Sequence, residues 1–218
     1  MAERTIAGKN DAGVDKIMYW YKDNFLSDSL FKTFNKEILD RYEPRKEWVD
    51  DDIYGLHLSG ENYKEDAPVR IKGEAYPEKN EYIHSAVKLR SKSLPEIVRT
   101  IKKCMIEDMQ LVNPLARMMW FQYHSNKHKV IQHYDNTLAG KSNKQSFTSL
   151  VYMHETWEDS WGGELTFLND KQSILPKPNR LLVYSRDEEH WVNEITHDLE
   201  DYKRMFLFTA WTVDNDFI

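Results

Sequence analysis

A histidine and an aspartate two residues apart, His133 and Asp135, are the pair in this sequence best suited to bind a metal ion. In an extended segment, residues two apart point to the same face, so the imidazole and the carboxylate would lie side by side. Together they supply two thirds of a facial triad of two histidines and one carboxylate. With 8 histidines and 36 acidic residues in the chain, such a triplet also arises by chance, so a second histidine is needed.

Two downstream histidines, His190 and His197, are candidates for that third ligand. His190 precedes the strand-like run 191–195, whose apolar members would anchor it. His197 lies in the acidic stretch 196–201, which offers nothing to hold an imidazole steady. The residues therefore favour His190 and leave His197 as the alternative.

The composition describes a globular chain of 218 residues that carries a net charge of −6, with 40% hydrophobic residues. The acidic balance argues against a general nucleic-acid binder. A single cysteine, Cys104, excludes an intramolecular disulfide and fits a reducing compartment. The sequence shows no signal peptide and no run of about 18 apolar residues, so we expect a soluble, cytoplasmic protein without a membrane partner.

Two amphipathic helices are predicted in the first half of the chain. One begins at Ser27 or Asp28 and runs to about Tyr42. The other begins at a capping box formed by Ser93 and Glu96, with a proline in its first turn. Its apolar face includes Cys104, which we interpret as a small buried residue and not as a reactive thiol.

The remaining residues of this half give weaker signals. Residues 1–16 are polar, and we expect them to be loosely ordered before a strand at 17–21. Residues 43–92 contain prolines and acidic clusters that predict loops and brief strands, such as Val69–Lys72. This segment is either a lid or substrate-recognition insertion, or a surface elaboration without a role.

After Pro114 the pattern changes to short apolar runs separated by turn residues. These runs lie at 118–123, 130–133, 146–154, 164–168, 174–175, 181–184, 191–195 and 205–213. Helices followed by about eight strands predict a mostly β fold with helical support (α+β). We expect a β-sandwich or jelly-roll core buttressed by the N-terminal helices.

From about Phe121 to Trp211 the sequence resembles the catalytic core of the Fe(II)/2-oxoglutarate-dependent dioxygenases, and most of all their prolyl 4-hydroxylase-like branch. The matching segments occur in the family's order: Tyr123, His133–Asn136, Thr148–Met153 with Trp157, Gly162–Leu165, Leu175–Tyr184, His190–Val192 and Arg204–Trp211. The resemblance implies a double-stranded β-helix (jelly-roll or cupin-like) core with the N-terminal helices packed on one sheet. It also implies one dioxygenase domain over residues 1–218. In it, residues 1–115 supply helical support and a variable insertion, and residues 116–213 form the catalytic β core.

The resemblance also implies a set of site residues. Ionised Asp135 and neutral His133 and His190 would hold Fe(II). Arg204 would pair with the far carboxylate of the co-substrate 2-oxoglutarate, Tyr152 would donate its hydroxyl to the same carboxylate, and Tyr123 would lie nearby. O2 is the second co-substrate, and ascorbate is a candidate reductant.

One departure from the family pattern concerns the basic anchor. The family usually spaces the basic residue and the later tryptophan six apart, whereas Arg204 and Trp211 are seven apart. A β-bulge between them would restore the register. Lys203 is the alternative anchor, although the forked guanidinium of Arg204 suits a carboxylate better.

The activity implied is hydroxylation of an aliphatic C–H bond, with decarboxylation of 2-oxoglutarate to succinate and CO2. The substrate implied is a prolyl residue in a peptide or protein, or free proline. Hydroxylation of another amino acid or a small metabolite is the alternative. Three other classes of protein remain as rivals: a metal-free jelly-roll binding protein, a metal-dependent isomerase or hydrolase on a cupin-like barrel, and, less favoured, a nucleic-acid demethylase. The sequence does not predict the oligomeric state.

Several other conspicuous residues are expected to be structural. His124 and His128 are four apart, but their segment indicates a solvated turn. Gly162 and Gly163 predict a turn with unusual backbone angles, without the following helix that a phosphate site needs. His154 either faces the substrate or ends a turn.

Overall fold

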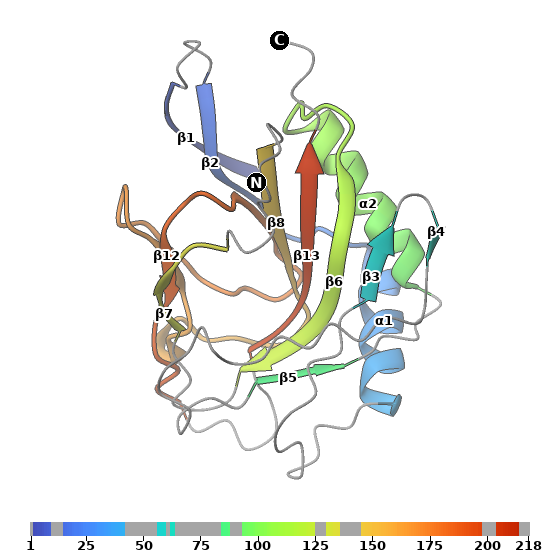
Figure 1. The fold of residues 1–218 in the computed structure, drawn as a ribbon. Coiled ribbons are helices and arrows are strands. Elements are labelled where there is room, and N and C mark those ends of the chain that lie inside the picture. The colour runs from blue at the N-terminus through green and yellow to red at the C-terminus, as the bar shows by residue number, and fades with distance from the viewer. Residues whose placement is uncertain are drawn as a thin grey trace.

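Two facing β-sheets, two α-helices and a short 3-10 helix, η3 (Asp159–Trp161), make up the described part of the chain (Figure 1). The structure is a computed structural model, and it describes residues 2–9, 15–41, 56–59, 62–63, 84–87, 93–124, 130–135, 145–197 and 204–213. The predicted strand at 69–72 lies outside these residues, as does most of the segment 43–92.

The larger sheet is the one against which the two α-helices pack. In spatial order its strands are β1 (Ala2–Lys9), β2 (Asp15–Lys22), β11 (Leu181–Ser185), β8 (Gln145–Tyr152), β13 (Arg204–Val213), β6 (Leu115–His124), β3 (Leu56–Ser59) and β4 (Asn62–Tyr63). A further strand, β5 (His84–Val87), also pairs with β6. All the pairings in this sheet are antiparallel.

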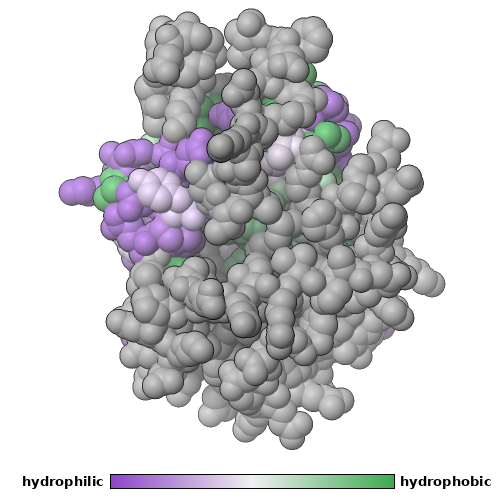
Figure 2. Space-filling view, in the orientation of Figure 1, coloured by the Kyte–Doolittle hydropathy of each residue, from purple (hydrophilic) through white to green (hydrophobic). Residues whose placement is uncertain are grey.

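The smaller sheet has the order β10 (Ser173–Ile174), β9 (Leu165–Phe167), β12 (His190–Val192) and β7 (Val130–His133). From β6 to β13 the chain passes back and forth between the two sheets, which is the winding of a double-stranded β-helix. The predicted fold class is therefore confirmed. Figure 2 shows hydrophilic residues gathered on the side of the molecule where the smaller sheet lies.

Strand alternation divides the interior into two apolar clusters. The outer cluster lies between the larger sheet and the helices, and it includes Val151, Leu207 and Trp211 from the sheet. The inner cluster lies between the two sheets, and Tyr152 and Phe206 belong to it. Consecutive residues along β8 and along β13 thus face opposite clusters. Only those that face the inner cluster can contribute to a site between the two sheets.

The helices cover the larger sheet on the side away from β7 and β12 (Figure 1). They are α1 (Asp28–Arg41) and α2 (Leu94–Glu107), close to the predicted spans. Ser93 makes no side-chain capping bond, but its carbonyl accepts hydrogen bonds from the amides of Glu96 and Ile97. Cys104 is buried as predicted, and burial raises the pKa of its thiol to about 11. No helix among the described residues is long and apolar enough to cross a membrane.

The expectation of a loosely ordered N-terminus is wrong for residues 2–9. They form β1, which pairs antiparallel with β2 at the edge of the larger sheet. The predicted strand at 17–21 is part of β2. An edge strand is held by backbone hydrogen bonds and needs few apolar side chains, so a polar sequence gives little sign of it.

Asn179 and Arg180 join the start of β11 to the segment between β2 and α1. The Asn179 side chain accepts a hydrogen bond from the Leu26 amide at 2.9 Å and donates one to the Leu26 carbonyl at 2.8 Å. The Arg180 guanidinium donates to both carboxylate oxygens of Asp23 and to the Leu175 carbonyl. These hydrogen bonds hold the segment between β2 and α1 against the start of β11.

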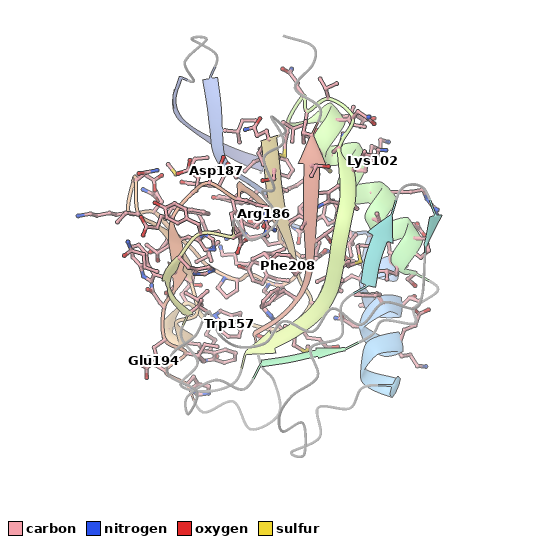
Figure 3. The ribbon with its side chains drawn as sticks, viewed as in Figure 1. Lys102, Trp157, Arg186, Asp187, Glu194 and Phe208 are labelled. Carbon is pink, nitrogen blue, oxygen red and sulfur yellow. The ribbon has the colours of Figure 1, made fainter. Side chains whose placement is uncertain are left out.

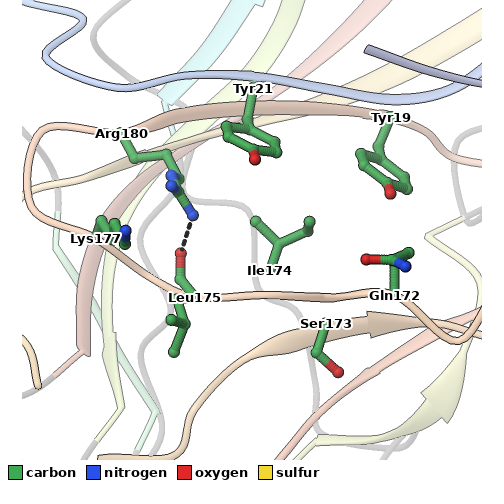
Figure 4. A pocket seen from close by; sticks show the side chains of 8 residues that line it. All are labelled: Tyr19, Tyr21, Gln172, Ser173, Ile174, Leu175, Lys177 and Arg180. Atoms are coloured by element: carbon green, nitrogen blue, oxygen red, sulfur yellow. Dashed lines mark hydrogen bonds between the residues drawn. The ribbon is translucent and has the colours of Figure 1, made fainter. Parts of the chain in front are cut away.

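Arg180 also lies in a pocket at this edge, drawn in Figure 4. The pocket is lined by Tyr19, Tyr21, Gln172, Ser173, Ile174, Leu175, Lys177 and Arg180. The guanidinium carbon lies 4.3 Å from the centre of the Tyr21 ring, a cation–π contact. Asp23 pairs with the Arg180 guanidinium, so its charge is already neutralised. We therefore interpret Arg180 as a structural residue that links β2 to β11.

Gly162 is required where the chain turns before β9. Its φ is +75°, and a Cβ atom at this position would lie 2.1 Å from the carbonyl oxygen of Glu194. Gly163 also has a φ of +75°, so the predicted turn with unusual backbone angles is confirmed. The close approach permits the isolated β-bridge between Gly162 and Ile195.

We predict that Gly162→Ala lowers the free energy of unfolding by about 2 kcal/mol or more, because the methyl group must displace the Glu194 backbone. Urea unfolding monitored by tryptophan fluorescence measures the change. Ser160→Ala, at an exposed position two residues away, is the matched control and should change stability by less than about 0.5 kcal/mol. Equal stability of the two variants would contradict the close approach.

Candidate metal centre

Two imidazoles and one carboxylate meet on the inner face of the smaller sheet. His133, Asp135 and His190 each offer a ligand atom, and these atoms lie within 4.8 Å of one another. The Nε2 atoms of His133 and His190 lie 3.5 Å and 3.8 Å from the same oxygen of Asp135, Oδ1. The structure thus brings together the three residues predicted to bind the metal.

The strand pairing explains this meeting. His190 begins β12 and is the direct antiparallel partner of His133 at the end of β7, so their rings lie 4.4 Å apart between centres. Asp135 follows two residues after His133 and returns to the same face. The intervening Tyr134 points the other way: it is 51% exposed, and its hydroxyl donates to Glu189.

The other oxygen of Asp135, Oδ2, accepts two hydrogen bonds from the larger sheet. The Thr148 hydroxyl donates to it at 2.6 Å and the Tyr184 hydroxyl at 2.8 Å. The Tyr184 ring also packs edge-on against the His190 ring at 4.8 Å. The Asp135 carboxylate therefore contacts side chains from both sheets: Oδ1 faces the two imidazoles, and Oδ2 accepts from the two hydroxyls.

A buried arginine stands behind the carboxylate. Arg186 is 4% exposed, and it donates to the backbone carbonyl of Asp135 and, at 3.3 Å, to the Thr148 hydroxyl. Figure 3 shows Arg186 and Phe208 in the space between the two sheets. The guanidinium supplies a positive charge close to the Asp135 carboxylate.

The protonation states suit metal binding. Burial by itself would raise the pKa of Asp135, but the contact with His133 and the nearby His190 and Arg186 side chains hold that pKa well below its usual range. Burial lowers the pKa of His190, against the opposing effect of Asp135. At neutral pH the carboxylate is ionised and the His190 imidazole is neutral.

The hydrogen bonding of His190 selects the nitrogen that a metal would use. Its Nδ1 lies 2.8 Å from the Glu188 carbonyl oxygen, which can only accept, so Nδ1 carries the proton. The lone pair is then on Nε2, the atom that faces Asp135. Two imidazole nitrogens and one carboxylate oxygen on one face are the donor set of mononuclear Fe(II) oxygenases, so the residues fit such an ion.

Of the three residues predicted to bind 2-oxoglutarate, the structure describes the side chain of one. Tyr152 is fully buried in the inner cluster, where its ring meets Phe206 edge-on at 6.2 Å. For Tyr123 in β6 and Arg204 at the start of β13, the structure describes the backbone, in which Arg204 pairs with His124.

The bulge predicted between Arg204 and Trp211 is not found in β13. That strand keeps an unbroken register against β8 from Phe206 to Val213. The register shift at Ala210/Trp211 lies in the pairing with β6, where Arg117 is the extra residue. Trp211 therefore faces the outer cluster and donates from its indole nitrogen to the Ser149 hydroxyl at 2.8 Å.

Of the other histidines, the structure describes the side chains of His154 and His197, and it places His124 at the end of strand β6 and not in the predicted turn. His154 is fully buried: its Nδ1 accepts a hydrogen bond from the Met205 amide, and its Nε2 donates to the Pro176 carbonyl. It links the start of β13 to the segment before β11. His197 is exposed and stacks on Trp161 at 4.8 Å, and His128 lies outside the described residues.

Sequence reasoning missed Thr148, Tyr184 and Arg186. Strand alternation held a usable signal, because Thr148 is four residues before inward-facing Tyr152 and Tyr184 is two residues after inward-facing Leu182. A hydroxyl at an inward position of a buried strand needs a partner, and Asp135 is that partner. Arg186 gave no comparable signal, since it follows β11 in a charged stretch.

The comparisons with known proteins agree with this geometry. A model of the 2OG-Fe(II) oxygenase superfamily matches residues 118–212. A comparison with curated proteins gives no match.

Solved prolyl hydroxylases have similar folds. A Pseudomonas putida prolyl-4-hydroxylase is 12% identical, with a TM-score of 0.57 over 90% of this chain and 92% of that one. The viral collagen prolyl hydroxylase of Paramecium Bursaria Chlorella virus-1 is 13% identical, with a TM-score of 0.56 over 97% and 95%. A Trichoplax adhaerens prolyl hydroxylase, solved with a hypoxia inducible factor peptide fragment, is 16% identical, with a TM-score of 0.53 over 90% and 83%.

We predict that His190→Ala weakens Co(II) binding to the purified protein by 10-fold or more, whereas His197→Ala leaves it unchanged. The first change removes one of three converging ligands, and the second alters an exposed ring stacked on Trp161. Isothermal titration calorimetry measures both affinities. Loss of binding in His197→Ala with retention in His190→Ala would reverse the assignment of the distal histidine.

Proposed function

We propose that the chain, whose residues 118–212 match a model of the 2OG-Fe(II) oxygenase superfamily, hydroxylates an aliphatic C–H bond of a prolyl residue in a peptide or protein. The reaction consumes O2 and converts 2-oxoglutarate to succinate and CO2. When bound, the iron supplies the oxidising chemistry. The residues of the chain hold the ion, the co-substrate and the substrate.

The observation that carries this function is the convergence of His133, Asp135 and His190 on one face. Three protein ligands leave three positions of an octahedral ion open, enough for a two-pronged co-substrate and O2. A metal-free binding protein of the same fold has no need for an ionised aspartate between two imidazoles. The convergence therefore favours the enzyme over that rival.

We assign the co-substrate to Arg204, Tyr152 and Tyr123. Tyr152 lies in the inner cluster, on the side of the larger sheet that faces the metal centre. Arg204 lies an even number of residues before Phe206 and Phe208, both of the inner cluster, whereas Lys203 lies an odd number before them. Strand alternation therefore supports Arg204 as the partner of the distal carboxylate.

The substrate class rests on the fold. Three solved relatives are prolyl hydroxylases, and the Trichoplax adhaerens structure contains a peptide. Peptidyl proline is thus the first candidate and free proline the second, followed by another amino acid or small metabolite. We place the iron-dependent reaction in the cytoplasm, with ascorbate as the reductant that keeps the ion ferrous.

We predict that the purified protein, supplied with Fe(II), ascorbate, 2-oxoglutarate and O2, forms succinate in amounts that rise with proline-containing peptides. Mass spectrometry should find a gain of one oxygen on the peptide. His133→Ala is the control and should abolish the increase, because two ligands remain. Equal stimulation by peptides lacking proline would overturn the prolyl assignment, and no succinate above the control would overturn the dioxygenase function.

We predict that Arg204→Ala raises the KM for 2-oxoglutarate roughly 10- to 100-fold, since a charge-assisted bond to the carboxylate is lost. Arg204→Lys keeps the charge without the fork and should recover part of the affinity. Lys203→Ala is the matched control and should leave the KM unchanged. The opposite pattern, with Lys203→Ala defective and Arg204→Ala normal, would move the anchor to Lys203.

A further inference from the structure

The two oxygens of the Asp135 carboxylate have different surroundings. Oδ1 faces the Nε2 atoms of His133 and His190 at 3.5 Å and 3.8 Å. Oδ2 accepts short hydrogen bonds from the hydroxyls of Thr148 and Tyr184. Only Oδ1 is therefore left for a metal ion.

We propose that Thr148, Tyr184 and Arg186 are positioning residues that hold the Asp135 carboxylate in this orientation, so that it offers one oxygen and not two to the metal. The inference rests on the proposed function, because it takes Asp135 to be a metal ligand. It adds three residues that do not themselves touch the ion.

The need for such a restraint comes from the place of Asp135 in the fold. β7 ends at His133, so Asp135 lies beyond the last residue held by the strand pairing. The hydroxyls come from β8 and β11 of the opposite sheet. They therefore tie the end of a strand in the smaller sheet to the body of the larger one.

Arg186 sets the direction of the Thr148 hydroxyl. The guanidinium can only donate, so in its 3.3 Å bond to Thr148 the hydroxyl oxygen is the acceptor. The hydroxyl proton is then directed to Asp135 Oδ2, 2.6 Å away. The second bond of Arg186, to the Asp135 backbone carbonyl, fixes the main chain of the same residue.

Tyr184 supplies the second hydroxyl. It donates to Asp135 Oδ2 at 2.8 Å. A hydrogen bond from a hydroxyl to a carboxylate is stronger than one between two neutral groups. The Tyr184 ring, packed against His190 and Phe167, is held in place by its own contacts.

The consequence concerns the open positions of the ion. A carboxylate that turned to offer both oxygens would occupy a fourth position, leaving two for 2-oxoglutarate and O2, which need three. With Oδ2 held by two hydroxyls, the fourth position stays open. The three positioning residues, which we call the carboxylate clamp, therefore keep a position free for the co-substrate.

The test uses the full chain, Co(II) as the probe and four variants. Tyr184→Phe and Thr148→Val each remove one hydroxyl, and Thr148→Ser restores the one at position 148. Thr209→Val is the matched control, because this buried threonine of neighbouring β13 makes no hydrogen bond through its hydroxyl to any described residue. Titration gives the Co(II) dissociation constant, the visible spectrum reports the coordination sphere, and thermal unfolding without metal reports folding.

We expect Tyr184→Phe and Thr148→Val to weaken Co(II) binding roughly 10- to 100-fold and to change the visible spectrum. Thr148→Ser should return both readouts toward wild type, and Thr209→Val should alter neither. Wild-type affinity and spectrum in folded Tyr184→Phe and Thr148→Val would overturn the clamp while leaving the proposed function intact. Failure of the wild-type chain to bind Co(II) would overturn the metal assignment itself.

Discussion

The antiparallel pairing of His190 with His133 is the constraint on which the rest of the site depends. Side chains alternate along a strand, so a slip of one residue between β7 and β12 would put Trp191 in place of His190 and turn the imidazole outward. The register is supported by the second pairing of β12, in which His190 and Val192 lie opposite Phe167 and Leu165 of β9. The apolar inward residues of the smaller sheet thereby fix the position of the polar ones.

The larger sheet contributes in a different way. Its inward face supplies Thr148 and Tyr184, whose hydroxyls reach across to Asp135. His154 at the end of β8 accepts from the Met205 amide and donates to the Pro176 carbonyl, holding the first residues of β13 beside the segment before β11. Arg204 precedes Met205, so this buried histidine supports the strand end at which we propose the co-substrate anchor.

The double-stranded β-helix and the meeting of His133, Asp135 and His190 could be predicted because the family resemblance covers an ordered set of segments from Tyr123 to Trp211. The His-x-Asp pair alone was not sufficient, since such pairs also arise by chance. The edge strand β1 was missed, since edge pairing leaves few apolar residues to recognise.

The register of β13 could not be predicted, because its extra residue, Arg117, lies on the partner strand. Strand alternation indicates that Thr148 and Tyr184 point inward, but it does not identify the partner of their hydroxyls. That partner, Asp135, is 13 and 49 residues away and follows a strand of the other sheet.

The charges of the centre are arranged before any ion arrives. A buried carboxylate normally becomes protonated, and a buried histidine near a carboxylate tends to become charged. Here the contact with His133, followed by the nearby His190 and Arg186 side chains, lowers the pKa of Asp135 against the effect of burial. Burial lowers the pKa of His190. Metal ligands must be an ionised carboxylate and a neutral imidazole, and a site that begins with other protonation states must release protons to bind. At neutral pH Asp135 is therefore ionised and His190 is neutral, which are the states that a metal ion needs in these ligands.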